Sequence, residues 1–162
     1  KRAFNAEDWK REDWVSDMVK ALQNERFFRW FDSGDIYKLK LAEKMLKVCK
    51  LTPWVNHWIP TQTWSIEAYK PILESLDALP NVVLRASAKD LESPVKGWKH
   101  SSVIVTTIEN AQKIGAKICH SATNEGKCGP CRDCYSKDVP IIAYLAHGAK
   151  MKKHILLSEA KV

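Results

Sequence analysis

The feature that most constrains the fold is a regular alternation of strand-like and helix-like segments. Residues 26–31, 54–61 and 81–87 are rich in aromatic and branched apolar side chains, which is typical of strands. Residues 36–50 and 65–79 lie between them and carry apolar side chains at helical spacing. Strand, helix, strand, helix, strand predicts right-handed βαβ units, and therefore an α/β fold with a parallel sheet or a partial (β/α) barrel.

The rest of the chain completes this pattern. The sequence predicts four further segments: an amphipathic helix over residues 6–24, a loop over residues 88–100, a strand over residues 101–107 and a buried strand over residues 141–146. We therefore expect an α/β scaffold over residues 1–115. A cysteine-rich, metal-binding segment with the final strand follows over residues 116–162 and packs on the same domain.

Four of the five cysteines lie close together near the C-terminus, at Cys119, Cys128, Cys131 and Cys134. The last three are separated by two residues each, and thiolates at this spacing on tight turns converge on one soft cation. Two structural disulfides are the alternative, but the cysteine number is odd and 162 residues can bury a core without cross-links. The cluster therefore predicts a metal site, whereas the isolated Cys49 is expected to be a small core residue.

The spacing also bears on which metal is bound. Three cysteines in consecutive steps of this kind are typical of iron–sulfur proteins, whereas a four-thiolate zinc site usually has two separate cysteine pairs. We expect an iron–sulfur cluster, with zinc as the alternative.

Small polar or acidic residues follow several of the predicted strands: Asp32, Ser33, Gly34 and Asp35; Thr61 and Gln62; Ser87; Thr106 and Thr107. Ligands bind at the carboxyl ends of parallel strands, so we expect a small-molecule cofactor there, although ordinary turn residues are the alternative. Two carboxylates beside a glycine favour a cation or an amine. A magnesium-dependent hydrolase using Asp32 and Asp35 is a weaker interpretation, because the other strand ends carry no acid.

The formal charge of +7 suggests acidic partners such as nucleic acid. The lysines, however, are spread over the helix-like segments, which indicates a solvated surface. The longest apolar run, residues 141–146, is far too short to cross a bilayer, so no membrane partner is expected.

Several motifs together resemble a family of phage proteins named after mycobacteriophage gene product eighty-eight. The resemblance covers residues 27–147 and rests on RWFDSGDIY, WIPTQTW, LPNVVLRASA and the cysteine cluster followed by IIAYLAH. It implies a partial barrel similar to radical S-adenosylmethionine enzymes and a location in the cytoplasm of the phage-infected bacterial cell. In such a barrel Gly34 and Asp35 would hold the methionine amine and Ser87 would lie near the ribose. The resemblance also places His147 near the cysteines or the strand ends.

The chain departs from the radical enzymes in one respect. Their Cys-x3-Cys-x2-Cys loop precedes the strand with the glycine–acid motif, and no such motif stands between Lys1 and Phe27. Because initiator methionine is normally retained before lysine, we expect a fragment or a trimmed product. Two functions are open: a cofactor-dependent enzyme or its remnant carrying an iron–sulfur cluster, or a non-catalytic module whose structural zinc site supports binding of nucleic acid or a host protein. No catalytic residue, substrate or oligomeric state is assigned.

Overall fold

The computed structural model describes residues 7–147, without the side chains of residues 122 and 123. Residues 148–162 of the predicted cysteine-rich segment lie outside the described residues. The helices and strands alternate along the chain: α2 (Trp14–Ala21), β1 (Phe27–Arg29), α3 (Leu39–Leu51), β2 (Asn56–Thr61), α4 (Lys70–Asp77), β3 (Val82–Ser87), β4 (Ser101–Val105), α5 (Ile108–Lys113), β5 (Lys117–Ile118) and β6 (Ile141–Leu145). Four short 3-10 helices complete the list: η1 (Thr63–Ser65), η2 (Glu67–Tyr69), η3 (His120–Thr123) and η4 (Asp133–Tyr135).

The strands form a six-stranded sheet in the order β1-β2-β3-β4-β6-β5. The four pairings whose registers are described are all parallel, for example Phe27 opposite Asn56 and Ser101 opposite Ile141. Consecutive parallel strands need a crossover connection, and the helices between the first three strands supply it. The predicted α/β class with a parallel sheet is therefore confirmed.

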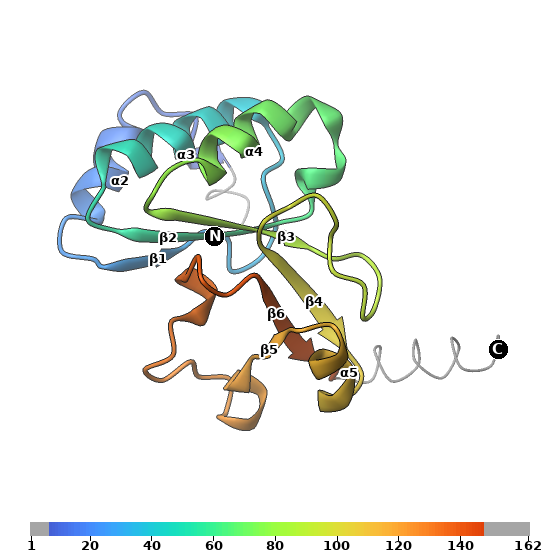
Figure 1. Ribbon diagram of the computed structural model, residues 1–162. Helices are drawn as coiled ribbons and strands as arrows, with labels where there is room; N and C mark the ends of the chain where they lie inside the picture. Colours follow the sequence, from blue (N-terminus) through green and yellow to red (C-terminus); the bar gives the residue numbers. More distant parts are fainter. Residues whose placement is uncertain (1–6, 148–162) are drawn as a thin grey trace. The chain divides into compact units, whose positions relative to one another are not determined.

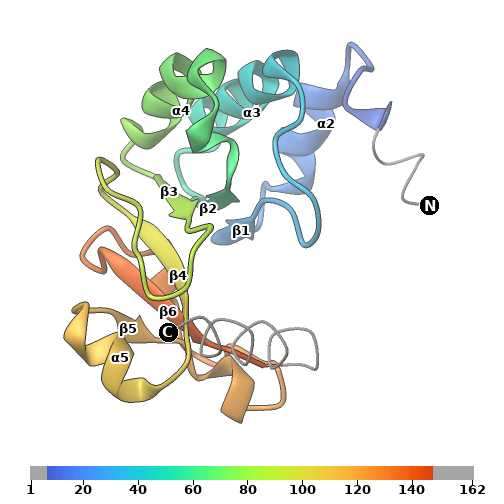
Figure 2. The same ribbon diagram turned by 90° about the vertical axis from the view of Figure 1, so that its right-hand side faces the viewer.

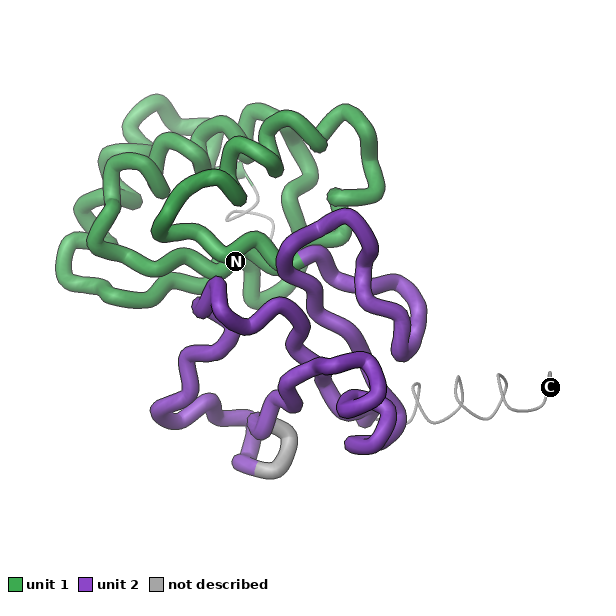
Figure 3. Tube along the Cα trace, in the orientation of Figure 1, with its two compact units in different colours: residues 1–85 green, residues 86–162 purple. Residues whose placement is uncertain are grey.

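Two compact units divide the chain, residues 1–85 and residues 86–162 (Figure 3). The boundary falls within β3, after Arg85, so the last two residues of this strand belong to the second unit. Ala86 and Ser87 pair there with Ser101 and Ser102 of β4.

In the first unit, α2, α3 and α4 lie on one side of β1 and β2 (Figures 1 and 2). The core is apolar because each helix turns one stripe inward, and the fully buried residues include Met45, Val48, Ile59, Leu73 and Leu76. Met45 and Val48 in α3, and Leu73 and Leu76 in α4, are each three residues apart, which is a helical spacing and explains why the sequence located both helices.

Three predicted helices differ from the sequence-based expectation. The predicted helix 6–24 is interrupted by turns at residues 9–13, so α2 covers only Trp14–Ala21. The predicted helix 36–50 begins only at Leu39, because residues 31–38 form an extended loop that leads away from β1. The predicted helix 65–79 divides into two 3-10 turns followed by α4, which has Pro71 in its first turn. Proline is tolerated there since the N–H it lacks would have no partner within the helix.

In the second unit, β4, β6 and β5 pack against the short helix α5. Val103, Val105, Ala111 and Ala143 form the buried cluster between them. The Thr107 hydroxyl caps α5 by accepting a hydrogen bond from the backbone N–H of Asn110 at 3.1 Å.

Residues 88–100 form a loop, as predicted. The longest helix of the described part is α3 with 13 residues, and none of the helices within residues 7–147 is long and apolar enough to span a membrane.

Candidate functional site

Asp35 and Thr61 meet at the carboxyl ends of β1 and β2, where the sequence predicted a cofactor site. The Thr61 hydroxyl donates to Oδ1 of Asp35 at 2.6 Å, and the backbone N–H of Ile36 donates to the same oxygen at 2.7 Å. The backbone N–H of Gln62 donates to Oδ2 at 2.6 Å. The Asp35 carboxylate therefore ties the loop after β1 to the end of β2.

A third hydroxyl extends this arrangement. Oγ1 of Thr63 lies 2.6 Å from Oγ1 of Thr61. Because Thr61 already donates its proton to Asp35, Thr63 must be the donor of this bond. The chain of donors runs from Thr63 through Thr61 to Asp35, and both threonines are buried.

Asp32, Ser33 and Gly34 form the exposed part of the loop. Gly34 has a φ of +89°, a conformation that glycine adopts without steric cost. Phe31 has a φ of +58°, which is rare for a bulky residue. The loop thus carries two exposed polar side chains on a strained turn directly beside the strand end.

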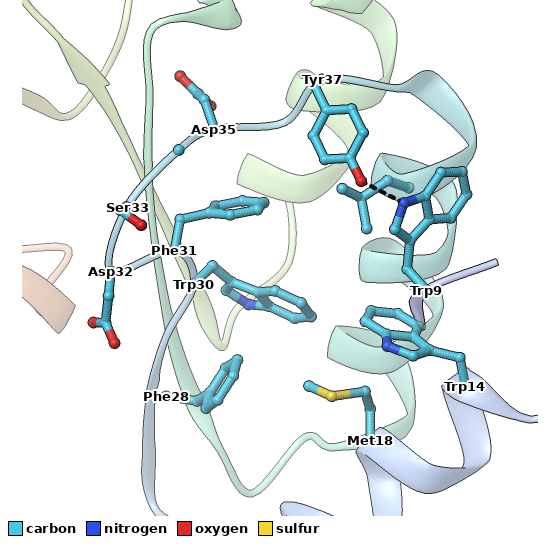
Figure 4. A pocket seen from close by; sticks show the side chains of 12 residues that line it. Trp9, Trp14, Met18, Phe28, Trp30, Phe31, Asp32, Ser33, Asp35 and Tyr37 are labelled. Atoms are coloured by element: carbon cyan, nitrogen blue, oxygen red, sulfur yellow. Dashed lines mark hydrogen bonds between the residues drawn. The ribbon is translucent and has the colours of Figure 1, made fainter. Parts of the chain in front are cut away.

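The inner side of this loop lines an aromatic pocket of about 720 Å³ within the first unit (Figure 4). We call it the aromatic pocket. Its twelve lining residues are Trp9, Trp14, Met18, Phe28, Trp30, Phe31, Asp32, Ser33, Gly34, Asp35, Tyr37 and Leu41. Trp9 and Tyr37 lie far apart in the sequence, but the indole N–H of Trp9 donates to the Tyr37 hydroxyl at 2.6 Å. The volume lies in the range of small-molecule sites.

His57 lies buried beneath the pocket wall. Its Nδ1 accepts the indole N–H of Trp30 at 3.3 Å, so the ring proton must be on Nε2, which lies 2.9 Å from the Thr52 hydroxyl. The Thr52 hydroxyl donates to the carbonyl of Val48 at 2.7 Å and can accept from Nε2. Burial lowers the pKa of His57 to about 4. His57 is therefore a neutral structural residue.

Ser87, the remaining predicted cofactor residue, belongs to the second unit. Its hydroxyl lies 3.4 Å from that of Ser102, the residue opposite it in β4. Its role in cofactor binding stays a prediction.

Glu92 accepts several hydrogen bonds that the sequence did not predict. Its Oε1 accepts hydrogen bonds from the backbone N–H and the hydroxyl of Thr106 and from the Asn110 amide at 2.7 Å. The Thr106 hydroxyl is the largest influence that lowers the pKa of Glu92. A single glutamate in a loop without periodicity gives no sequence signal, so only the fold reveals that it anchors residues 88–100 to the end of β4.

All five cysteines are free thiols. Cys49 is fully buried in α3, as expected for a core residue, and burial raises the pKa of its thiol to about 12. Cys128 and Cys131 are exposed, whereas Cys119 and Cys134 are half-buried.

Three of the clustered cysteines lie around the edge of β5 and β6. Cys119 directly follows β5, and its backbone N–H donates to Ala143 of β6 at 2.8 Å. Cys134, in η4, has its sulfur 3.7 Å from the hydroxyl of Tyr144. Cys131 is linked to β5 through Asp133, which accepts from its thiol and pairs with Lys117. Cys128 precedes Cys131 in a tight turn, closed by a 3.1 Å bond from the Cys131 N–H to the Cys128 carbonyl.

An ion pair fastens the cysteine segment to β5. Nζ of Lys117 lies 2.9 Å from a carboxylate oxygen of Asp133, and the Cys131 thiol donates to the same carboxylate at 3.2 Å. The backbone N–H of Asp133 favours the Cys131 thiolate. Burial, the hydrogen bond that the thiol donates to the Asp133 carboxylate, and the charges of Asp133 and Cys119 together raise the pKa of Cys131.

Within residues 7–147, no three side chains of histidine, cysteine, aspartate or glutamate stand in a ready-made metal-binding arrangement. The four-cysteine metal site therefore stays a prediction. His147, two residues after the end of β6, is exposed, with Nδ1 3.0 Å from the carbonyl of Leu145.

The comparisons with known proteins bear on the family alone. No curated protein and no solved structure matches the chain. A family model described as Gene product 88 matches residues 1–156. Since the match covers almost all of its 162 residues, the chain belongs to the Gene product 88 family of phage proteins.

Proposed function

We propose that this protein binds an iron–sulfur cluster through Cys119, Cys128, Cys131 and Cys134. The observation that carries the proposal is the Cys-x2-Cys-x2-Cys spacing of free thiols, together with the contacts that hold Cys119 and Cys134 beside β6. Thiolates are the preferred ligands of iron–sulfur clusters and of zinc, so the donor set fits either.

The charges around the segment support this proposal. Four thiolates around a metal centre carry net negative charge, which nearby cations offset. Lys117 is fastened beside Cys131 through Asp133. Arg132 donates to the backbone carbonyls of Gly129 and Cys131 at 2.8 Å and 2.7 Å, which places its guanidinium at the turn between the cysteines.

Anaerobic purification of the protein, followed by iron, zinc and sulfide analysis and a visible spectrum, tests the proposal. We expect a brown protein with acid-labile sulfide, and loss of colour in C119S, C128S, C131S and C134S. The matched control is C49A, which removes a thiol from the core and should keep the cluster. A colourless protein with one zinc per chain would select the zinc alternative. A protein that binds neither metal would contradict both forms of the proposal.

We infer a second function, binding of a cofactor of the S-adenosylmethionine type, from the Asp35 and Thr61 contact at the strand ends and from the resemblance to radical S-adenosylmethionine enzymes. A carboxylate offers about four acceptor positions, and the chain uses three of those on Asp35. Asp32 and Ser33 are exposed beside it and complete a polar surface for an amine. The cofactor would supply its sulfonium chemistry, and these residues would orient its amino acid end.

Calorimetric titration of S-adenosylmethionine into the wild type and into D32N and S33A tests this second function. Both variants change exposed groups and should fold normally, so weaker binding would reflect lost ligand contacts. Unchanged affinity in both variants would remove this loop from the cofactor site.

A zinc-containing protein would instead favour the non-catalytic module, with nucleic acid as the partner that its charge of +7 supports. Binding through phosphates weakens steeply as salt rises. The affinity for nucleic acid should therefore fall between roughly 50 and 200 mM salt. An affinity that stays the same over this range would contradict that alternative.

A further inference from the structure

The lining of the aromatic pocket carries acidic but no basic side chains, although the chain as a whole is basic. Its twelve residues include two carboxylates, Asp32 and Asp35, and no lysine, arginine or histidine. The chain as a whole carries a net charge of +7. Lys44 lies just behind the wall, where its Nζ donates to the carbonyl of Trp9 at 2.8 Å. A lining with two carboxylates and no cationic side chain still disfavours anionic ligands and favours cations.

The walls of the pocket are ring faces and edges set at angles to one another. Trp14 and Trp30 have their ring centres 6.4 Å apart at 44°, and Phe28 meets Trp30 edge to face at 5.1 Å. In Figure 4, Trp9, Trp14 and Met18 approach from one side, and Phe28, Trp30 and Phe31 from the other. An aromatic face that is turned toward the pocket attracts a cation through its negative potential.

Two features hold the walls in place. The hydrogen bond from Trp9 to Tyr37 fastens the N-terminal segment to the loop after β1. The left-handed backbone of Phe31, with φ of +58°, directs its ring toward the pocket at a cost in strain. A bulky residue stays in a strained backbone conformation only where the surrounding structure holds it there. The strain at Phe31 places its ring in the wall of the aromatic pocket.

We propose that the aromatic pocket binds an organic cation, namely an ammonium group that carries methyl or benzyl substituents. The rings attract the charge and replace part of its hydration. The carboxylates of Asp32 and Asp35 point away from the rings and add negative potential only from behind the loop. This site lies entirely in the first unit and does not depend on metal binding by the cysteines. It uses the aromatic side of the loop, whereas the proposed cofactor amine would meet its polar side.

The experiment compares a cation with a neutral molecule of the same shape. Benzyltrimethylammonium and neopentylbenzene differ in one atom, nitrogen against carbon, and therefore in charge. Both are titrated into the full chain, with tryptophan fluorescence and calorimetry as readouts. We expect saturable binding of the cation, about tenfold tighter than that of the neutral molecule, as cation–π attraction in a partly desolvated site provides.

Variants assign this preference to the pocket. F31L keeps an apolar side chain but removes a ring face, so it should weaken cation binding about fivefold and leave binding of neopentylbenzene nearly unchanged. F27L is the matched control, because Phe27 is an exposed phenylalanine of β1 outside the pocket lining. D32N should weaken cation binding without changing the fold.

Absence of cation binding, equal affinity for the two probes, or an unchanged preference in F31L would each overturn the proposal. Metal content, measured on the same samples, reports separately on the cysteines.

Discussion

Thr61 donates its hydroxyl proton to Asp35 across a distance of 2.6 Å, which joins the ends of two neighbouring strands. Asp35 follows β1, and Thr61 is the last residue of β2. Parallel pairing brings these ends to the same edge of the sheet, so residues that are 26 positions apart share one hydrogen bond. The carboxylate acts first as a support for the loop of residues 31–35, and any ligand at this edge meets a preorganised surface.

D35N should destabilise the protein by about 2 kcal/mol, because hydrogen bonds to a charged acceptor are replaced by weaker ones. An asparagine also places an NH2 group against either the Thr61 hydroxyl or the Gln62 N–H, both of which are donors. Urea unfolding measures the change. D32N is the control and should stay within about 0.5 kcal/mol of the wild type, since its carboxylate is exposed. Equal stability of D35N and D32N would show that the contact adds nothing.

Stability should fall as the pH drops from about 6.5 to about 4, because His57 is held neutral. Its pKa is about 4 in the folded protein and about 6.5 when unfolded, so the unfolded chain binds more protons in this interval. The loss amounts to about 3 kcal/mol. Urea unfolding at several pH values measures it.

H57Q provides the matched comparison for this pH dependence. A glutamine can accept from Trp30 and donate to Thr52, but it does not titrate. The free energy of unfolding of H57Q should therefore fall much less than that of the wild type between pH 6.5 and 4. An identical pH profile in wild type and variant would assign the decline to other groups.

E92Q should destabilise the second unit by about 1 to 2 kcal/mol, because the donors of Thr106 and Asn110 lose a charged acceptor. The pKa of Glu92 is lowered below 4.5, so its contribution is present above that pH and is lost as the pH falls through the folded value. Hydrogen exchange of residues 88–106 should report faster local opening. D90N, an exposed change in the same loop, should exchange like the wild type. Unchanged exchange in E92Q would mean that the loop is held by other contacts.

The five cysteines should react with a thiol reagent in three steps in metal-free, reduced protein. Cys128 and Cys131 are exposed and should react before the half-buried Cys119 and Cys134. Within the first pair Cys131 should be slower, because its raised pKa leaves less thiolate. Cys49 should react only on unfolding, because it is inaccessible and its pKa is raised to about 12. Thiol counting with and without denaturant checks this order, and C49A should lack the final step. Reaction of Cys49 in the folded protein at the rate of Cys128 would contradict its buried position.

Much of the fold follows from local patterns in the sequence. The apolar spacing of α3 and the branched residues of β2 and β3 identify these elements without any partner, since both periodicities arise from backbone geometry. Once the strands are known to be parallel, the strand-end rule brings Asp35 and Thr61 together. The isolated, apolar setting of Cys49 likewise predicts its burial.

Other elements give no local signal. The helix α5 has six residues and β5 has two, too few to show a period. The position of β6 between β4 and β5 depends on which edges remain free after the first strands have paired.

By itself, the sequence determined the α/β class, the main strands and the cysteine cluster, because composition and periodicity are properties of neighbouring residues. Only the tertiary structure decided that Glu92 anchors a loop, that His57 stays neutral, and that Trp9 and Tyr37 close one pocket. Each of these results needs groups from distant segments to exclude water from the same space and to satisfy one another's hydrogen bonds. Such contacts arise from packing, and no spacing along the chain encodes them.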